Sequence, residues 1–178
     1  MRLMPQDILF LLKLVAKGDQ SWTYNSLAME LEMSPSEVHY AARRAVASRL
    51  GIKAEKQIRV HAQNLLEFLS HGIQYCFFPE KGGITRGMPT AHAAAPLKDQ
   101  FISVNEMPPV WPDPDGHVRG ESFAPLHRSA PKAAKKDENL YMLLALVDAI
   151  RGGSAREKAA ARKELEQSLG QYGEHTKS

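Results

Sequence analysis

The feature that most constrains this chain is the tetrapeptide SPSE at 34–37, which separates two short segments with helical periodicity. A serine followed by a proline, with a glutamate three residues after the serine, is typical of a helix N-terminus. In this capping box, Ser34 and Glu37 each accept a hydrogen bond from the other's backbone N–H. The tetrapeptide therefore predicts a helix that begins after Ser34 and runs to Leu50, with Gly51 ending it.

Two further helices are predicted before this cap. Apolar residues at helical spacing indicate a first helix from Pro5 to Ala16, apolar around nearly its whole circumference. A second short helix is expected from its cap at Asn25 to about Glu32, followed by a tight turn. Two short helices joined by such a turn predict a helix-turn-helix unit, whose second helix is the recognition helix.

The predicted recognition helix has small apolar residues on its inner side and polar residues on its outer side. The candidate DNA contacts are Ser34, Ser36, His39, Tyr40, Arg43 and Arg44, with Lys53, Lys56 and Arg59 holding the flanking backbone. Hydroxyl, imidazole and guanidinium groups donate to base edges and phosphates. Residues 34–59 hold six basic and two acidic side chains, a local excess that suits a phosphate backbone. An ordinary solvated helix face is the alternative interpretation.

The segment over residues 5–60 resembles the helix-turn-helix core of bacterial winged-helix regulators such as the MarR family. The residues that carry the resemblance are Leu27, Ala28, Leu31, Met33, Ser34, Pro35, Ser36, Glu37, Val38, Ala41 and Arg44. It implies a DNA-binding transcriptional regulator, and we expect a repressor. The family has a two-stranded hairpin directly after the recognition helix. Residues 52–59 instead predict a loop or a rudimentary wing, so a standard wing contact is not expected.

The remaining elements complete an α+β fold that is mainly α. The predicted elements are a helix at Val60–His71, a strand at 73–79, a tight turn at Gly82-Gly83, a strand at Ile84–Met88, a hairpin joining Val110–Trp111 to His117–Arg119, and helices at Glu138–Ile150 and after Ser154. We expect three regions: a helix-turn-helix domain at 1–64, a Pro/Gly-rich region with β-hairpins at 65–131, and a C-terminal helical region at 132–178.

A weak internal repeat lies in the middle region. The sequence GITRG at 83–87 is followed by Ala-Pro-Leu, and GHVRG at 116–120 is followed by the same tripeptide. If both copies form hairpins, Arg86 and Arg119 are candidates to bind an anionic effector between them. An arginine paired with a carboxylate or carbonyl in each turn is the alternative.

Two kinds of partner are predicted from different regions of the chain. The two strongly apolar helices, Pro5–Ala16 and Glu138–Ile150, predict a self-association surface and hence a homodimer on a palindromic operator. Region 73–131, with aromatic residues in a Pro/Gly-rich segment, favours a second hypothesis, an antitoxin-like or adaptor protein that docks a protein partner.

Other function classes find little support in the sequence. We find no catalytic motif and expect no enzyme, no cofactor and no metal site, because the histidines lack metal-ligand spacing. The apolar runs are too short to span a membrane, and the N-terminus lacks the pattern of a secretory signal. The single cysteine, Cys76, allows no internal disulfide and is expected to be buried. Together these features predict a cytoplasmic protein.

Overall fold

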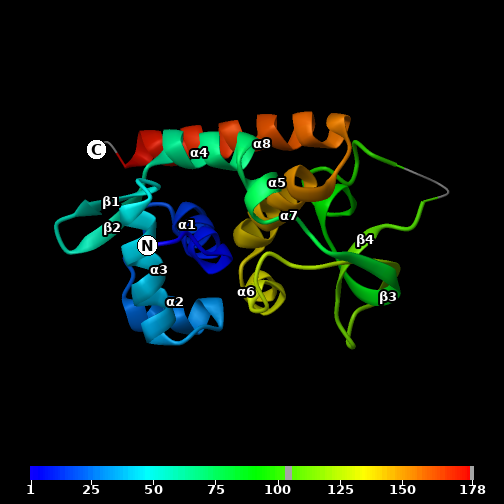
Figure 1. The fold of residues 1–178 in the computed structure, drawn as a ribbon, viewed down its shortest axis with the longest axis horizontal. Helices are drawn as coiled ribbons and strands as arrows, with labels where there is room; N and C mark the ends of the chain where they lie inside the picture. The colour runs from blue at the N-terminus through cyan, green and yellow to red at the C-terminus, as the bar shows by residue number, and fades with distance from the viewer. Residues whose placement is uncertain (103–105, 177–178) are drawn as a thin grey trace.

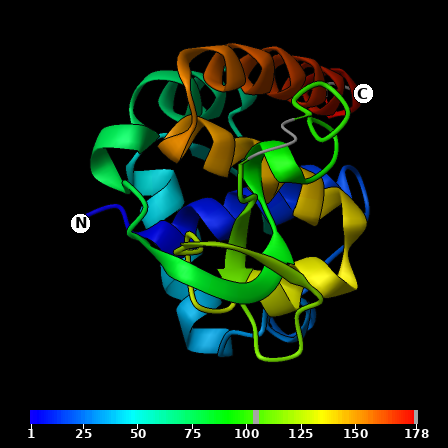
Figure 2. The ribbon, with the colours of Figure 1, turned by 90° about the vertical axis from the view of Figure 1, so that its right-hand side faces the viewer.

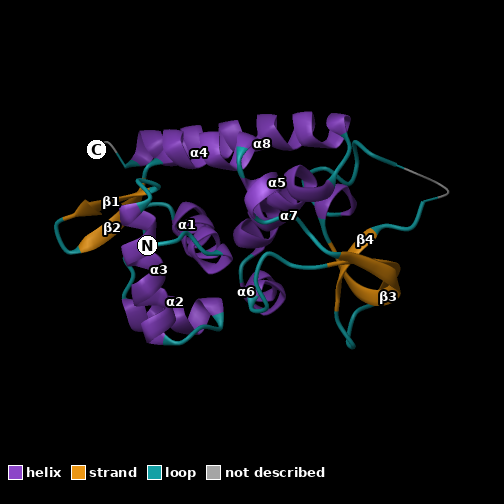
Figure 3. Ribbon diagram, in the orientation of Figure 1, coloured by secondary structure: helices purple, strands orange, loops and turns teal. Residues whose placement is uncertain are grey.

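The computed structural model describes residues 1–102 and 106–176, where it has eight α-helices and two small sheets (Figures 1 and 3). The first elements are α1 (Pro5–Lys17), α2 (Tyr24–Leu31), α3 (Pro35–Ala47), β1 (Gly51–Ala54) and β2 (Gln57–Val60). They are followed by α4 (Ala62–His71), α5 (Ile73–Cys76), β3 (Lys81–Pro89), the 3-10 helix η1 (Ala91–Ala93), β4 (Pro109–Pro112) and β5 (Val118–Phe123). The chain closes with α6 (Ala130–Lys136), α7 (Glu138–Gly152) and α8 (Ala155–His175). The predicted α+β class, mainly helical, is confirmed.

Helix α1 packs against both α3 and α7 and is enclosed by its own chain. The side chains of Ile8, Leu9, Phe10, Leu11 and Leu12 are all fully buried. Helix α7 is buried in the same way, because Leu140 and the nine consecutive residues from Leu143 to Arg151 are all buried. The self-association surface predicted on these two helices is therefore wrong, because intramolecular packing already covers their apolar faces.

Helix α8 connects the two ends of the molecule along its upper edge (Figure 1). Its 21 residues give it a length of about 30 Å at 1.5 Å per residue. Near its start, Glu157 lies 3.3 Å from the His92 ring of η1. Near its end, the Tyr172 hydroxyl accepts a hydrogen bond of 3.1 Å from the Val60 N–H of β2. One hydrophobic core contains residues from all three of the regions expected at 1–64, 65–131 and 132–178.

Strands β1 and β2 form an antiparallel hairpin directly after α3, with Gly51 opposite Val60 and Ala54 opposite Gln57. Of the two alternatives predicted for residues 52–59, a loop or a rudimentary wing, the loop is therefore wrong, and a short two-stranded hairpin is present. The turn has no Asn-Gly or Asp-Gly pair, and Glu55 adopts the left-handed conformation with a φ of 48°. A hairpin closed by a non-glycine residue in this conformation gives no strong local turn pattern, which explains why the sequence did not distinguish a hairpin from a loop.

Strands β3, β4 and β5 form a small closed barrel at the other end of the molecule, which faces the viewer in Figure 2. Strand β3 is antiparallel to both neighbours, and β4 and β5 pair in parallel to close the barrel. The predicted hairpin of Val110–Trp111 with His117–Arg119 is wrong, because these strands pair mainly with β3. The tight turn predicted at Gly82-Gly83 is also wrong, because both glycines lie within β3.

The segment before the barrel also differs from its prediction. Residues 73–79 were expected to be a strand, but Ile73–Cys76 forms the short helix α5. Only Ile73 of this helix is buried, and Cys76 is exposed rather than buried as expected. An apolar run of this length does not distinguish a strand from a helical turn by periodicity alone.

A buried polar cluster fixes the barrel to α7. The fully buried carboxylate of Asp148 accepts hydrogen bonds from the Thr90 hydroxyl and the Trp111 indole N–H, both at 2.7 Å. Arg151 donates to the same carboxylate at 2.6 Å and to the Phe77 carbonyl at 2.7 Å. Each strong donor has an acceptor here, which is the condition under which burial of charge is tolerated.

Candidate nucleic-acid interface

Helix α3 begins at the cap that the sequence predicts. The Ser34 hydroxyl accepts a hydrogen bond of 3.2 Å from the Glu37 N–H, and the Glu37 carboxylate accepts one of 2.8 Å from the Ser34 N–H. These hydrogen bonds lower the pKa of Glu37. The inner face of the helix consists of the buried residues Val38, Ala41, Ala42 and Ala45. Small side chains on this face allow α3 to pack closely on α1 and α2. The capping box and the inner face are confirmed.

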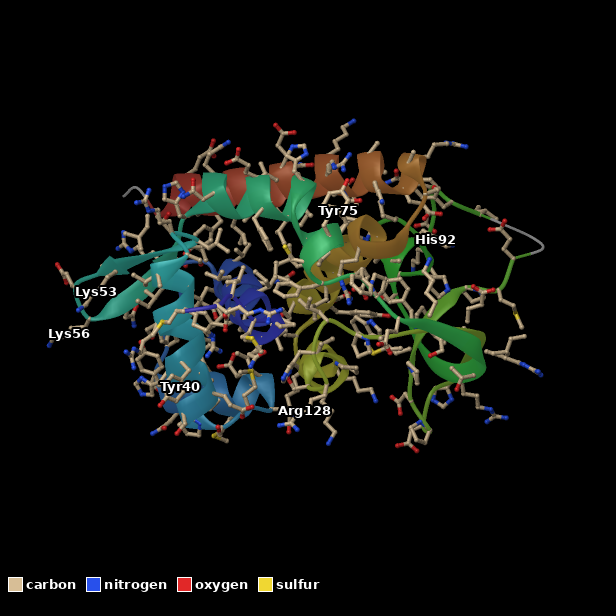
Figure 4. The ribbon with its side chains drawn as sticks, in the orientation of Figure 1. Tyr40, Lys53, Lys56, Tyr75, His92 and Arg128 are labelled. Atoms are coloured by element: carbon tan, nitrogen blue, oxygen red, sulfur yellow. The ribbon has the colours of Figure 1, made fainter. Side chains whose placement is uncertain are left out.

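The outer face of α3 exposes the predicted polar side chains. Ser36, His39, Tyr40 and Arg43 are all exposed, and Figure 4 shows Tyr40 at the lower end of the helix. The Arg43 guanidinium lies 5.9 Å from the centre of the Tyr40 ring. The His39 ring stacks on Tyr24 with ring centres 3.7 Å apart. These contacts hold side chains against the helix and leave their donor groups accessible. Such donors, presented from one helix face, are what direct contact with base edges and phosphates requires.

Arg44 differs from its neighbour Arg43. Its guanidinium binds the fully buried carboxylate of Asp7, with Nε donating at 2.8 Å and Nη2 at 2.7 Å. These hydrogen bonds raise the pKa of Arg44. Asp7 also accepts a hydrogen bond of 2.8 Å from the Met4 N–H at the start of α1. Arg44 therefore joins α3 to α1, and its assignment as a DNA contact is corrected to a structural one.

The hairpin carries the other three predicted cations, and all three are exposed. Lys53 and Lys56 are exposed and point away from the body of the molecule at the hairpin (Figure 4). Neither forms an ion pair with any residue that the structure describes. Arg59 instead donates a hydrogen bond of 3.0 Å to the Thr176 carbonyl at the end of α8. Arg59 therefore contributes charge to this surface and also anchors the hairpin.

Arg128 lies beside α3 although the sequence analysis did not select it. Its guanidinium is 3.6 Å from the Glu37 carboxylate, and its side chain is 84% exposed. Figure 4 places it near α2 and α6. Ninety-one positions separate Arg128 from Glu37 in the chain (128 minus 37). No local pattern relates two residues at that separation, so only the fold brings this cation to the start of α3.

The other two predicted arginines lie far from this surface. Arg86 is on β3 and Arg119 is on β5, at the barrel end of the molecule (Figure 1). They pair directly across the two strands rather than standing on two separate hairpins. The prediction that these two arginines lie together is therefore confirmed, but the prediction that they stand on two separate hairpins is wrong.

Comparison with known proteins adds no assignment, because no protein family, curated protein or solved structure matches this chain. Within residues 1–102 and 106–176, no helix is both long and apolar enough to cross a membrane. The same residues contain no group of three or more histidine, cysteine, aspartate or glutamate side chains placed to hold a metal ion.

Proposed function

We propose that this chain binds double-stranded DNA as a transcriptional regulator, with α2, α3 and the β1–β2 hairpin acting as a winged helix-turn-helix. The observation that carries the proposal is the combination of an exposed polar face on α3 with a projecting hairpin whose two lysines form no ion pair with the described residues. Helix α3 would enter the major groove, and the hairpin would lie along the adjacent backbone. Repression remains our expectation for the regulatory outcome.

The roles of the side chains follow from their surroundings. Arg43 is the candidate for a base contact, because it is exposed and has no carboxylate partner among the described residues. Lys53 and Lys56 are candidates for phosphate contacts on one flank. Arg128 is a candidate on the other flank, since it lies beside the start of α3. Arg44 has no role in this proposal other than holding α3 in place.

The test is selection of duplexes from sheared genomic DNA by the full chain, followed by fluorescence anisotropy with a selected duplex. Arg43→Ala should weaken binding by about tenfold, as expected when one base contact is lost. Affinity falls as salt rises, so the slope of log affinity against log salt is negative. Changing both Lys53 and Lys56 to glutamine should make this slope shallower by about 2, because two phosphate contacts are lost. Lys163→Ala, an exposed change on α8, is the control. Wild-type affinity and salt slope in all the interface variants would refute the proposal.

A protein-docking role for region 73–131 is a second candidate function. Tyr75 and Phe78 are 76% and 69% exposed, which is unusual for two aromatic residues so close in sequence. A docking surface would use these side chains. The predicted homodimer also remains a proposal, but it needs a surface other than α1 and α7.

A further inference from the structure

Two arginines face each other across one pair of strands in the barrel. In the antiparallel register of β3 and β5, Arg86 is the direct partner of Arg119. Both side chains are exposed. Directly opposed residues lie on the same face of a sheet, and like charges in that arrangement repel. A folded chain therefore keeps an unfavourable pair at this position.

Nothing in the described part of the chain neutralises this pair. No carboxylate there lies within ion-pair distance of either guanidinium. Glu121, two residues from Arg119 on the same strand, is opposite Ile84 instead and forms no ion pair with either arginine. The sequence offered, as its alternative, an arginine held by a carboxylate or a carbonyl in each turn; both arginines are exposed, and the described residues provide neither with a carboxylate partner.

The arginines line a shallow cavity. It has a volume of about 480 Å³ and is bordered by Ile84, Thr85, Arg86, His117 and Arg119. Small-molecule sites fall in a range of about 300–1,000 Å³. The cavity therefore combines two cations, an imidazole and one apolar side chain in a volume that suits a small ligand.

The glycines of the repeat explain why the two strands hold a fixed position. A Cβ atom on Gly87 would lie 2.0 Å from the Trp111 carbonyl oxygen, and one on Gly120 would lie 2.0 Å from the Pro108 carbonyl oxygen. A Cβ on Gly116 would be 2.5 Å from the Gly87 Cα. In each repeat an arginine is followed directly by a glycine. At that glycine the neighbouring strand lies so close that no side chain would fit. The backbone under both arginines is confined, so the spacing of their Cα atoms is fixed before a ligand binds.

We propose that Arg86 and Arg119, with His117 beside them, bind a small ligand that carries a phosphate group. A guanidinium matches two phosphate oxygens with parallel N–H donors, and two guanidinium groups balance a phosphate dianion. Bound anion would also remove the repulsion that the pair creates. The site is at the opposite end of the molecule from α3 (Figure 1). A ligand here therefore need not be the duplex of the proposed function, and a small phosphorylated molecule fits the cavity.

Isothermal titration calorimetry of the full chain with inorganic pyrophosphate at constant ionic strength tests this site. We expect saturable binding that is at least about tenfold weaker in the double variant R86Q/R119Q, since each lost arginine removes charge-assisted hydrogen bonds. K98Q/K163Q removes two exposed cations elsewhere and should bind as wild type does. Absence of saturable binding, or an equal loss in both double variants, would overturn the proposal.

Two further readouts distinguish this site from a structural role and from the DNA surface. Without ligand, R86Q/R119Q should be at least as stable to urea as the wild type, because the repulsion is gone. A clear loss of stability would show that the arginines support the fold instead. R86Q/R119Q should also leave affinity for the selected duplex unchanged. A loss like that of Arg43→Ala would assign the arginines to a nucleic-acid surface, whereas a failure of all DNA binding would leave the pyrophosphate result intact.

Discussion

At the α3 end of the molecule, exposed cations are spread along a helix and a hairpin, whereas at the barrel end two arginines oppose each other across one strand pair. Spread cations match a polymer that repeats its phosphates along an axis. A concentrated pair in a cavity matches one compact anion. The spacing of the cations, more than their number, therefore distinguishes the two proposed ligands.

Both ends also contain two kinds of cation, some exposed and available to a ligand and others buried in contacts that stabilise the fold. Arg43 and Arg44 are neighbours on α3, but only Arg44 reaches a buried carboxylate. At the barrel end, Arg119 is exposed and Arg151 is buried among carbonyl and carboxylate acceptors. Each end thus has its own structural arginine close to its candidate ligand-binding arginine, and substitution should distinguish the two kinds.

The largest expected effect is at Arg44. Arg44→Ala removes the partner of a fully buried carboxylate, so the free energy of unfolding should fall by about 3 kcal/mol. Arg43→Ala should change it by no more than about 0.5 kcal/mol, as is usual for an exposed side chain. Urea denaturation followed by circular dichroism measures both. Equal stability of the two variants would contradict the division of roles on α3.

The glycines of the barrel should give the next largest effect. Gly87→Ala and Gly120→Ala each place a Cβ atom 2.0 Å from a carbonyl oxygen, so each should destabilise the fold by about 2 kcal/mol. Gly83→Ala is the matched control, because a Cβ there meets nothing within 4 Å. It should stay within about 0.5 kcal/mol of the wild type in the same urea measurement. Similar losses at Gly83 and Gly120 would mean that close strand approach does not explain the repeat.

These two ends also differ in how far sequence reasoning reached. The start of α3 was predictable because its cap is a contact between residues three positions apart. The role of Arg44 was not, since Asp7 is 37 positions away and gives no pattern on α3. The barrel was mispredicted for the same reason. Its strands pair through β3 rather than through the turn at 113–116, and turn chemistry specifies only local pairing.

The internal repeat and the helical periodicity each predicted part of the structure but left part of it open. The repeat indicated that Arg86 and Arg119 belong together, but not that they face each other across two strands. The apolar circumference of α1 indicated burial on several sides, but it did not show whether the same chain or a second copy covers the helix. In each case the local pattern indicates that certain residues are paired or buried. Only the tertiary packing determines which other residues they contact.

The smallest expected effect concerns the ion cluster that joins the α1–α2 end to α7. Lys13 Nζ lies 2.8 Å from the Glu30 carboxylate and 2.7 Å from that of Asp137, and Lys17 also contacts Glu30. Burial opposes ionisation of both acids. The hydrogen bonds and positive charges of the lysines, joined at Asp137 by backbone N–H donors, together outweigh burial and lower the pKa of Glu30 from 4.5 and that of Asp137 from 3.8. The cluster is therefore most stabilising when both acids are ionised.

The sign of the resulting pH dependence follows from these shifts. Because the pKa values are lower in the folded chain, the unfolded chain takes up protons first as the pH falls below about 4.5. Stability contributed by the cluster is present at neutral pH and should decrease by about 1 kcal/mol as the pH falls through that range. Lys13→Met should reduce this loss between pH 6 and pH 3, measured by urea denaturation at each pH. Lys158→Met is the control, because Lys158 donates to the neutral amide of Gln74 and should leave the acid dependence unchanged. An unaltered pH profile in Lys13→Met would place the acid sensitivity elsewhere, and would remove this cluster as the electrostatic link between the α1–α2 end and α7.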